Sequence, residues 1–457
     1  MVRFAAAFVA ALTASVAAAA SSTTCGSGTK CPSDKPCCSQ YGECGTGAYC
    51  LGGCDPINSN SLDACTPEPV CESKTFNDWS NLAGVESNDK YLGNATESDW
   101  VSSGKPLVHN GELLLTMAKG SVGTLLAYNH YIWYGKVSAK LKTSRTAGVV
   151  TAFILLSDVK DEIDYEFVGT ELTTAQTNFY FQGILDWENS VNATTTDTFE
   201  NYHTYEIDWT PDDITWSLDG KSVRVLKKAD TYNETTQQYK FPQTPSRLQL
   251  SLWPAGLSTN APGTIAWAGG EISWDTADIK DPGYYYATFA EVSVTCYDPP
   301  SGANIKGDQA YIYTDDAGTN NTVEIVNANT VLGSFEATGL NMTLGATTST
   351  SSSTSTGTGT GTGTGTSTAT SASTSVADSV PGSSSGGSGG QSSSGGSSDS
   401  GSDSSDGSST SSGSSPASTG FSQGGDSPKT GAASANEHML QGSMFAVLVA
   451  VVALIAM

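Results

Sequence analysis

The sequence predicts an all-β protein, in which a small disulfide-rich knot precedes an antiparallel β-sandwich. Short segments of alternating apolar and polar residues, separated by turn residues, follow one another between residues 76 and 294. No long segment has the apolar spacing of an amphipathic helix. Nine of the ten cysteines fall before residue 72, in a stretch too short to be held by a hydrophobic core of its own.

Several strands of the sandwich are predicted by alternation alone. Residues 112–117 form one candidate strand and residues 205–209 another. Residues 214–218 then meet Asp219-Gly220, a dipeptide typical of hairpin turns, before residues 223–225. A hairpin at this point fits an antiparallel sandwich.

The segment 161–167 is the most informative of these. Glu162, Asp164 and Glu166 alternate with apolar or aromatic residues, so a strand here places three acids on one face and core side chains on the other. Like charges in a row repel one another, which favours a functional reason for keeping them. A solvated strand face and a calcium site are alternatives. Lys160 is the one countercharge nearby in the sequence, which weakens an ion-pair explanation.

The spacing of these acids permits glycosidase chemistry, which requires two carboxyl groups of unequal pKa. The Cα atoms of Glu162 and Glu166 would lie roughly 13 Å apart on a flat strand. A concave sheet would tip the side chains together until the carboxyl groups are about 5–6 Å apart, near the spacing of a retaining enzyme. Asp164 lies between them, where it would hydrogen-bond the nucleophile or share its proton and shift its pKa.

Residues 249–253 show a second informative alternation. Gln249 and Trp253 share one face with Ser251, while Leu250 and Leu252 share the other. If the leucines are core residues, Gln249 and Trp253 face a cleft, where an amide suits sugar hydroxyls and an indole suits a sugar ring. A core position is the usual alternative for a lone tryptophan in a sandwich, and the leucine alternation favours the cleft.

The order Glu162-Ile163-Asp164-Tyr165-Glu166 resembles the signature of glycoside hydrolase family 16. With Gln176-Thr177-Asn178-Phe179, residues 247–254 and Trp267-Ala268-Gly269-Gly270, it makes residues 70–300 most similar to the fungal Crh family of cell-wall transglycosylases. The resemblance implies a jelly roll with a concave, substrate-lined sheet. It implies no metal or other cofactor for the reaction, although calcium on the outer face of the sandwich remains open.

By the same resemblance, Glu162 would be the nucleophile and Glu166 the general acid and base of a double displacement, with Asp164 between them. Chitin would be the donor, and β-glucan or chitin the acceptor. The resemblance also assigns sugar-contacting positions, which are Gln249, Trp253, Thr264, Gln176 and Asn178. Two other functions stay open: a retaining endo-hydrolase of chitin or β-glucan, and a non-catalytic wall-binding mannoprotein. The intact set of three acids weighs against the second.

The clustered cysteines predict disulfides in a secreted protein. Zinc ligation is the alternative, but adjacent Cys37 and Cys38 suit a disulfide knot better. Residues 25–54 resemble a hevein-type chitin-binding module, which implies the pairs Cys25–Cys38, Cys31–Cys44 and Cys37–Cys50. We further expect Cys65 to pair with Cys71, which leaves Cys54 and Cys296 as partners.

Hevein-type modules hold N-acetylglucosamine with a serine and three aromatic rings. Ser39, Tyr41 and Tyr49 match, while Glu43 stands where a third ring is usual, so we expect low affinity. A purely structural knot is the alternative. We expect the module to act separately, so that removing residues 21–60 leaves turnover of soluble oligosaccharides largely intact.

The two ends of the chain predict its location. Residues 1–20 have the pattern of a secretory signal peptide cleaved after Ala20. Small residues at 431–435, a polar spacer and an apolar run of about 14 residues from Met444 match a glycosylphosphatidylinositol signal, with Gly431 as our choice of attachment residue. A tail anchor is the alternative and lacks the usual length and basic flank. We expect the protein on the outer plasma membrane or attached to the cell wall.

These features divide the chain into six parts. We expect a signal peptide (1–20), the hevein-like module (21–60), the sandwich (65–300), a β-rich or irregular extension (301–342), a Ser/Thr/Gly-rich stalk (343–435) and the anchor signal (436–457). The stalk has too few apolar residues to offset its chain entropy, and its composition favours O-glycosylation.

Charge narrows the partners. A net charge of −25, from 46 acidic and 21 basic residues, argues against nucleic acid as a partner, whereas a neutral polysaccharide makes no such demand. The sequons fit a secreted glycoprotein, and they begin at Asn94, Asn192, Asn233, Asn320 and Asn341. We expect a monomer.

Overall fold

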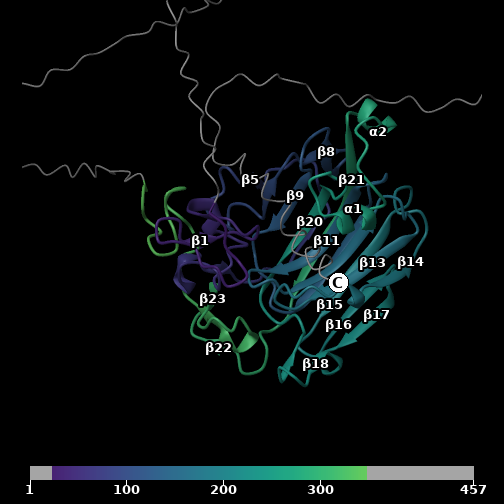
Figure 1. The fold of residues 1–457 in the computed structure, drawn as a ribbon. Coiled ribbons are helices and arrows are strands. Elements are labelled where there is room, and N and C mark those ends of the chain that lie inside the picture. The colour runs from purple at the N-terminus through teal and green to yellow at the C-terminus, as the bar shows by residue number, and fades with distance from the viewer. Residues whose placement is uncertain (1–22, 347–457) are drawn as a thin grey trace, which may run out of the picture. The chain divides into compact units, whose positions relative to one another are not determined.

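Two eight-stranded sheets pack face to face and form the sandwich (Figure 1). The computed structural model describes residues 23–346, all within one compact unit. The back sheet has the order β17-β16-β15-β10-β21-β8-β7, with β4 added to β21; the front sheet has the order β14-β13-β12-β11-β20-β9-β6-β5. Except for β5 and β6, which are parallel, neighbouring strands in both sheets are antiparallel. The structure therefore confirms the predicted antiparallel sandwich.

The strands of the back sheet are β4 (Lys74–Phe76), β7 (Leu107–His109), β8 (Glu112–Ala118), β10 (Gly135–Lys142), β15 (His203–Trp209), β16 (Asp213–Leu218), β17 (Lys221–Lys227) and β21 (Tyr284–Cys296). Those of the front sheet are β5 (Val85–Ser87), β6 (Trp100–Ser103), β9 (Thr124–Tyr128), β11 (Val149–Ser157), β12 (Glu162–Val168), β13 (Thr174–Tyr180), β14 (Val191–Thr194) and β20 (Ser246–Pro254). All the segments predicted from alternation are strands.

Short elements fill the connections. They are the helices α1 (Pro262–Trp267) and α2 (Ala277–Lys280), the hairpin β18 (Tyr232–Asn233) and β19 (Gln238–Tyr239), and 3-10 turns at Trp187–Asn189, Lys228–Thr231 and Asn320–Thr322. The predicted hairpin turn between β16 and β17 is present, and both Asp219 and Gly220 have the positive φ that such a turn requires. Within residues 23–346 no helix is long and apolar enough to cross a bilayer.

The core between the sheets is rich in large aromatic residues. Phe153 and Tyr165 from the front sheet and Trp209 and Trp216 from the back sheet are fully buried in it. Fully burying one such side chain contributes roughly 1.5–3 kcal/mol, so this core can stabilise the domain while other faces carry polar function.

The cysteine-rich module, residues 23–66, packs beside the sandwich. It contains the strands β1 (Cys37–Cys38) and β2 (Cys44–Gly45) and 3-10 turns at Gly47–Cys50 and Leu62–Ala64. The three disulfides implied by the hevein resemblance are present: Cys25–Cys38, Cys31–Cys44 and Cys37–Cys50. Among the described residues one group has metal-ligand spacing, formed by Cys25, Cys31 and Cys38, and all three sulfurs are already in disulfides.

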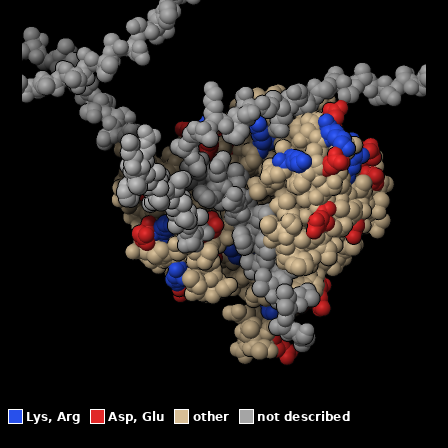
Figure 2. All heavy atoms as spheres, turned by 45° about the horizontal axis from the view of Figure 1, so that its top comes forward, with Lys and Arg blue, Asp and Glu red and all other residues tan. Residues whose placement is uncertain are grey.

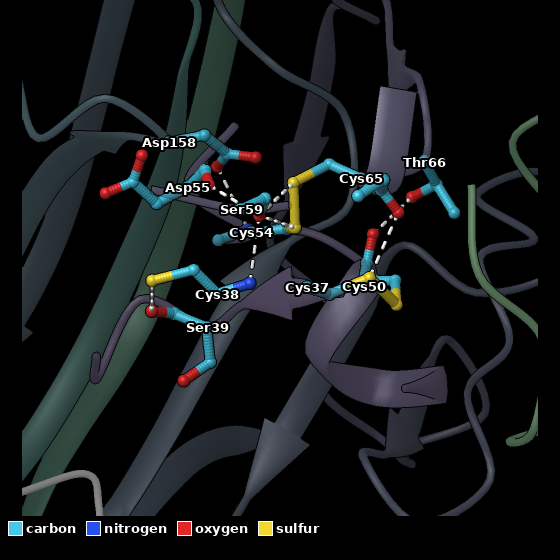
Figure 3. The surroundings of a disulfide bond; sticks show 12 residues. Cys37, Cys38, Ser39, Cys50, Cys54, Asp55, Ser59, Cys65, Thr66 and Asp158 are labelled. Atoms are coloured by element: carbon cyan, nitrogen blue, oxygen red, sulfur yellow. Dashed lines mark hydrogen bonds between the residues drawn. A yellow bond between two sulfur atoms is a disulfide. The ribbon is translucent and has the colours of Figure 1, made fainter. Parts of the chain in front are cut away.

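The predicted Cys65–Cys71 and Cys54–Cys296 pairs are wrong. Cys54 bonds Cys65, and Ser59 lies beside this bridge at the end of the module (Figure 3). Cys71 bonds Cys296 across a sequence separation of 225. The reason is the pairing of β4 with β21, which sets Lys74 opposite Val294 and so brings the two flanking cysteines together.

The segment after the sandwich is partly β-structure. β22 (Asn304–Ile305), β23 (Ala310–Tyr313) and β24 (Val323–Val326) form a four-stranded sheet with β3 (Glu68–Pro69). The chain then returns to the module, where Gly47 N donates to Ala337 O at 2.8 Å and Gly339 N donates to Ala64 O at 2.8 Å. Figure 1 shows this green segment beside the purple module.

Figure 2 shows acidic and basic side chains next to one another at the edge of the face it presents. Of the predicted glycosylation residues, Asn192 and Asn341 are exposed and the other three are half-buried. The predicted signal peptide, most of the stalk and the anchor signal with Gly431 lie outside the described residues.

Candidate active site

Strand β12 carries the three acids on the front face of the sandwich. Its other side chains, Ile163, Tyr165 and Phe167, are buried in the core, as the alternation predicts. The opposite face of the strand is therefore fixed, and Glu162, Asp164 and Glu166 project together from the front sheet.

The back sheet holds β12 in place from behind. Tyr165 Oη donates a 2.9 Å hydrogen bond to Ser217 O, and Trp216 Nε1 donates a 3.0 Å bond to Asp164 O. The donors and acceptors of both bonds are buried, so the bonds fix the position of β12, and with it the acids, relative to the back sheet.

Strand register brings the predicted sugar-contacting residues into line with the acids. Glu166 lies opposite Gln176 on β13, and Asp164 lies opposite Asn178. On the other side Asp164 pairs with Ile154 of β11, which in turn pairs with Gln249 of β20. Residues directly opposite one another share a face, so the polar residues of β13 and β20 lie on the same face as the acids, with apolar β11 residues such as Ile154 between β12 and β20.

Burial raises the pKa values of all three acids, and the charge of a neighbouring acid raises those of Asp164 and Glu166 further. Removal from water is the main cause for Glu162, whose pKa rises to about 7 although the Lys160 charge opposes the shift. Removal from water and the Glu162 charge raise the pKa of Glu166 to about 8. One carboxyl is thus readily protonated at neutral pH beside another that can ionise, which is the state required for general acid catalysis next to a nucleophile.

Asp164 is the most buried of the three, at 1% exposure. Burial, followed by the charges of Glu166 and Glu162, raises its pKa well above the usual range. Neither of its carboxyl oxygens has a hydrogen-bond partner of normal geometry among the described residues. A protonated Asp164 can donate a hydrogen bond to a neighbouring carboxylate and stabilise its ionised form.

Trp253 lies on the front face rather than in the sandwich core. It is half-buried, and its ring stacks against Trp267 with centroids 6.1 Å apart. Trp267 Nε1 also donates a 2.8 Å hydrogen bond to Gln176 Oε1. The two indoles and the amide form a surface that matches the apolar face and the hydroxyls of a sugar ring.

The other predicted contact residues are more enclosed. Gln249 is 4% exposed, and its Nε2 donates to Gln40 Oε1 of the module at 3.3 Å. Thr264, in α1, is 4% exposed, and its hydroxyl has no partner within residues 23–346. Asn178 Nδ2 donates to Tyr180 Oη at 2.8 Å.

Two further residues near the acids, Tyr180 and Asp161, were not among the predicted site residues. Tyr180 lies opposite Glu162, and burial together with the charge of Asp164 raises its pKa. The alternation of residues 174–180, which puts Tyr180 on the face of Gln176 and Asn178, was the available signal. Asp161 proves structural: its carboxylate accepts from Gln182 N at 3.0 Å and from Thr244 Oγ1 at 2.7 Å, fully buried.

In the module, Ser39 Oγ accepts weak bonds from Tyr41 N at 3.4 Å and Glu43 N at 3.3 Å. Tyr41 and Tyr49 are half-buried. A Cβ at Gly45 would lie 2.4 Å from the Tyr49 ring, so glycine is needed for the ring to pack there. Burial and the Glu43 charge raise the pKa of Tyr49, which places that carboxylate near the ring.

Comparison with known proteins agrees with this geometry. Residues 94–269 match the model of a family described as glycosyl hydrolases family 16. Crh-like protein 2 of Aspergillus fumigatus is 65% identical over 336 residues, which cover 73% of this chain and 76% of that protein. Congo red hypersensitive protein 2 of Saccharomyces cerevisiae is 54% identical over 332 residues, covering 72% and 71%.

Among solved structures, the Crh5 transglycosylase in complex with NAG is 28% identical, with a TM-score of 0.48, covering 60% of this chain and 99% of that one. The identity with the two curated relatives extends over more than two thirds of their lengths. The chain therefore belongs to the Crh-type cell-wall transglycosylases of glycosyl hydrolases family 16.

Proposed function

We propose that this enzyme cleaves chitin with retention at the anomeric carbon and transfers the released chain to β-glucan or chitin, which crosslinks the fungal cell wall. The observation that carries the proposal is the row of three acids with raised pKa values on one face of β12. Such a row is costly for stability, and its retention fits a site built for acid–base and nucleophilic chemistry.

In the first step the Glu162 carboxylate attacks the anomeric carbon of the donor sugar. The bond from that carbon to the leaving oxygen breaks, and Glu166 gives its proton to this oxygen. The product is an ester between the sugar and Glu162. Asp164, whose carboxyl oxygens have no hydrogen-bond partner of normal geometry among the described residues, turns its proton toward Glu162 in this step and so keeps the nucleophile ionised beside Glu166.

In the second step Glu166, now a carboxylate, takes the proton of the acceptor hydroxyl. The acceptor oxygen bonds to the anomeric carbon, and the ester to Glu162 breaks. A sugar hydroxyl as acceptor gives transfer, and water gives hydrolysis. The stacked Trp253 and Trp267, together with Gln176, which accepts a hydrogen bond from Trp267, supply a surface that can bind a sugar donor or acceptor and exclude water.

The test is to incubate the mature protein with labelled chitin oligosaccharide and an unlabelled glucan oligosaccharide, and to size the labelled products. Transfer predicts labelled products longer than the donor that appear only with acceptor present. Labelled fragments shorter than the donor, unaffected by the acceptor, would instead make the protein a retaining endo-hydrolase. The matched Glu162→Gln protein controls for contaminating activity.

We also propose that the enzyme works outside the cell as a monomer, held to the plasma membrane or the wall through a lipid-linked glycan at Gly431. Five disulfides among ten cysteines support an oxidising compartment. The mass of the mature C-terminal peptide tests the attachment: a peptide that retains Met457 contradicts it.

A further inference from the structure

A groove runs between the cysteine-rich module and the sandwich. Its volume is about 650 Å³ with its open mouth included. From the module it is lined by Ser39, Tyr41 and Tyr49, the residues that match a sugar platform, and from the sandwich by Ser103, Leu125 and Arg247.

The sandwich wall of this groove is the same face of the front sheet that carries the acids. Ser103 of β6 pairs with Leu125 of β9, which pairs with Ser251 of β20. Ser251 pairs with Ala152 of β11, which pairs with Glu166 of β12. These residues form one row across the sheet, and β9 lies three strand spacings, about 14 Å, from β12.

The module is held rigidly at the junction between groove and acids. Lys160 Nζ, next to β12, donates a 3.0 Å bond to Gln40 O. Arg247 and Gln249 both donate to Gln40 Oε1, at 3.4 and 3.3 Å. Gln40 stands between Ser39 and Tyr41, so the sugar platform is anchored to the floor of the cleft.

Backbone contacts make this junction tight. Gly53 N donates to Asp158 Oδ1 at 2.9 Å and to Tyr131 Oη at 3.0 Å, both in the sandwich. A Cβ at Gly52 would lie 2.6 Å from Arg247 Nη1. With the C-terminal segment bonded to Gly47 on another side, the module cannot swing away without breaking several buried hydrogen bonds.

We propose that the module's sugar platform and the β6–β9 end of the front sheet form one extended binding site for the same N-acetylglucosamine chain that the acids cleave. Two tyrosine rings offer stacking faces, while serine hydroxyls and the Arg247 guanidinium offer hydrogen bonds, a combination suited to a neutral sugar with amide groups. The proposal rests on the proposed function, and it gives the module a part in turnover rather than only in retention on the wall.

The experiment measures kcat/KM for a series of soluble chitin oligosaccharides of increasing length with the full-length secreted protein. Tyr41→Ala removes a stacking ring on the module side, and Ser103→Trp fills the groove from the sandwich side. Each should lower kcat/KM about fivefold for the chains long enough to span groove and acids, and leave the shortest cleaved chains unchanged. Tyr232→Ala, at an exposed tyrosine of the distant β18–β19 hairpin, should leave the whole series unchanged.

The outcomes separate the two proposals. If both groove variants keep the wild-type kcat/KM at every length, the extended site is wrong, even if Tyr41→Ala weakens retention on insoluble chitin. If Tyr41→Ala fails to fold, Ser103→Trp, which leaves the module untouched, decides alone. If wild type cleaves no chitin oligosaccharide of any length, the proposed function fails, and the extended site fails with it.

Discussion

The cysteine-rich module and the sandwich are stabilised by opposite means. The module, residues 23–66, holds four of the five disulfides and a few small buried residues. The sandwich has a single disulfide, Cys71–Cys296, which joins its two ends, and a core of large aromatic side chains. Covalent links let the module present its rings and backbone at the surface, whereas a large core lets the sandwich tolerate three mutually repelling acids.

The difference teaches where each region can carry function. In β12 of the sandwich, one face is buried in the core, so its chemistry is restricted to the other face. In the module, glycine backbone packs directly against side chains of the sandwich, as Gly52 does against the Arg247 guanidinium. The two regions meet at Gln40, where module backbone and cleft residues share hydrogen bonds.

The largest effect should come from the acids of the sandwich. Glu162→Gln and Glu166→Gln should each lower turnover by on the order of 10³-fold or more. The first removes the nucleophile that bonds to the anomeric carbon, and the second removes the acid that protonates the leaving oxygen. Binding to insoluble chitin should remain, since the module is intact. Steady-state rates with one labelled oligosaccharide check this, with Glu234→Gln, at an exposed site, as control. Near wild-type rates for either cleft variant would remove the assignment.

The next effect should come from the disulfides of the module. The double change Cys37→Ser with Cys50→Ser should cost about 3 kcal/mol and unfold the module, because little core is present to replace the bridge. The sandwich should stay folded and cleave the shortest oligosaccharides. Limited proteolysis measures whether the module has unfolded, retention on chitin measures its binding, and cleavage of the shortest oligosaccharides measures whether the sandwich stays folded. Protease resistance equal to wild type would show that the module does not depend on its bridges.

The pH dependence should separate the cleft from the rest of the sandwich. Activity should be maximal between pH 7 and 8, falling at lower pH as Glu162 is protonated and at higher pH as Glu166 loses its proton. Both folded pKa values lie above the ordinary value of 4.5, so between pH 4.5 and about 8 the folded state binds more protons than the unfolded state. The free energy of unfolding should therefore fall as pH rises from 4.5 to about 8.

Thermal unfolding of wild type and Glu166→Gln across pH 5–8 tests the sign. Between pH 5 and 8 the unfolding midpoint of the variant should change by a few degrees less than that of wild type, because one buried carboxyl no longer ionises. A wild-type midpoint that rises with pH over this interval contradicts the raised pKa values.

The smallest effect should come from the module's missing ring. Glu43→Trp should tighten retention on insoluble chitin by about 1 kcal/mol, because it adds one stacking contact next to Tyr49. Glu43→Gln, which removes only the charge, is the matched control. Equal retention of wild type and both variants would favour a structural knot.

Much of the site was readable from the sequence. The alternation around Asp164 fixed both the core face and the acid face of β12, since side chains on a strand alternate whatever lies around them. The same rule placed Leu250 and Leu252 in the core and Trp253 outside it. Three of the module's four bridges followed from its resemblance to a known knot, whereas Cys54–Cys65 did not.

Tertiary structure decided what depends on residues far apart in the chain. Cys71 meets Cys296 because β4 pairs with β21, and no local pattern encodes that pairing. Gln249 was expected to face the cleft as a sugar contact, yet its amide reaches Gln40 because the module docks over β20. A sequence pattern specifies which face of a strand a side chain occupies, but only the packing of whole elements specifies what that face contacts. Here that packing joins the cysteine-rich module and the sandwich into one surface.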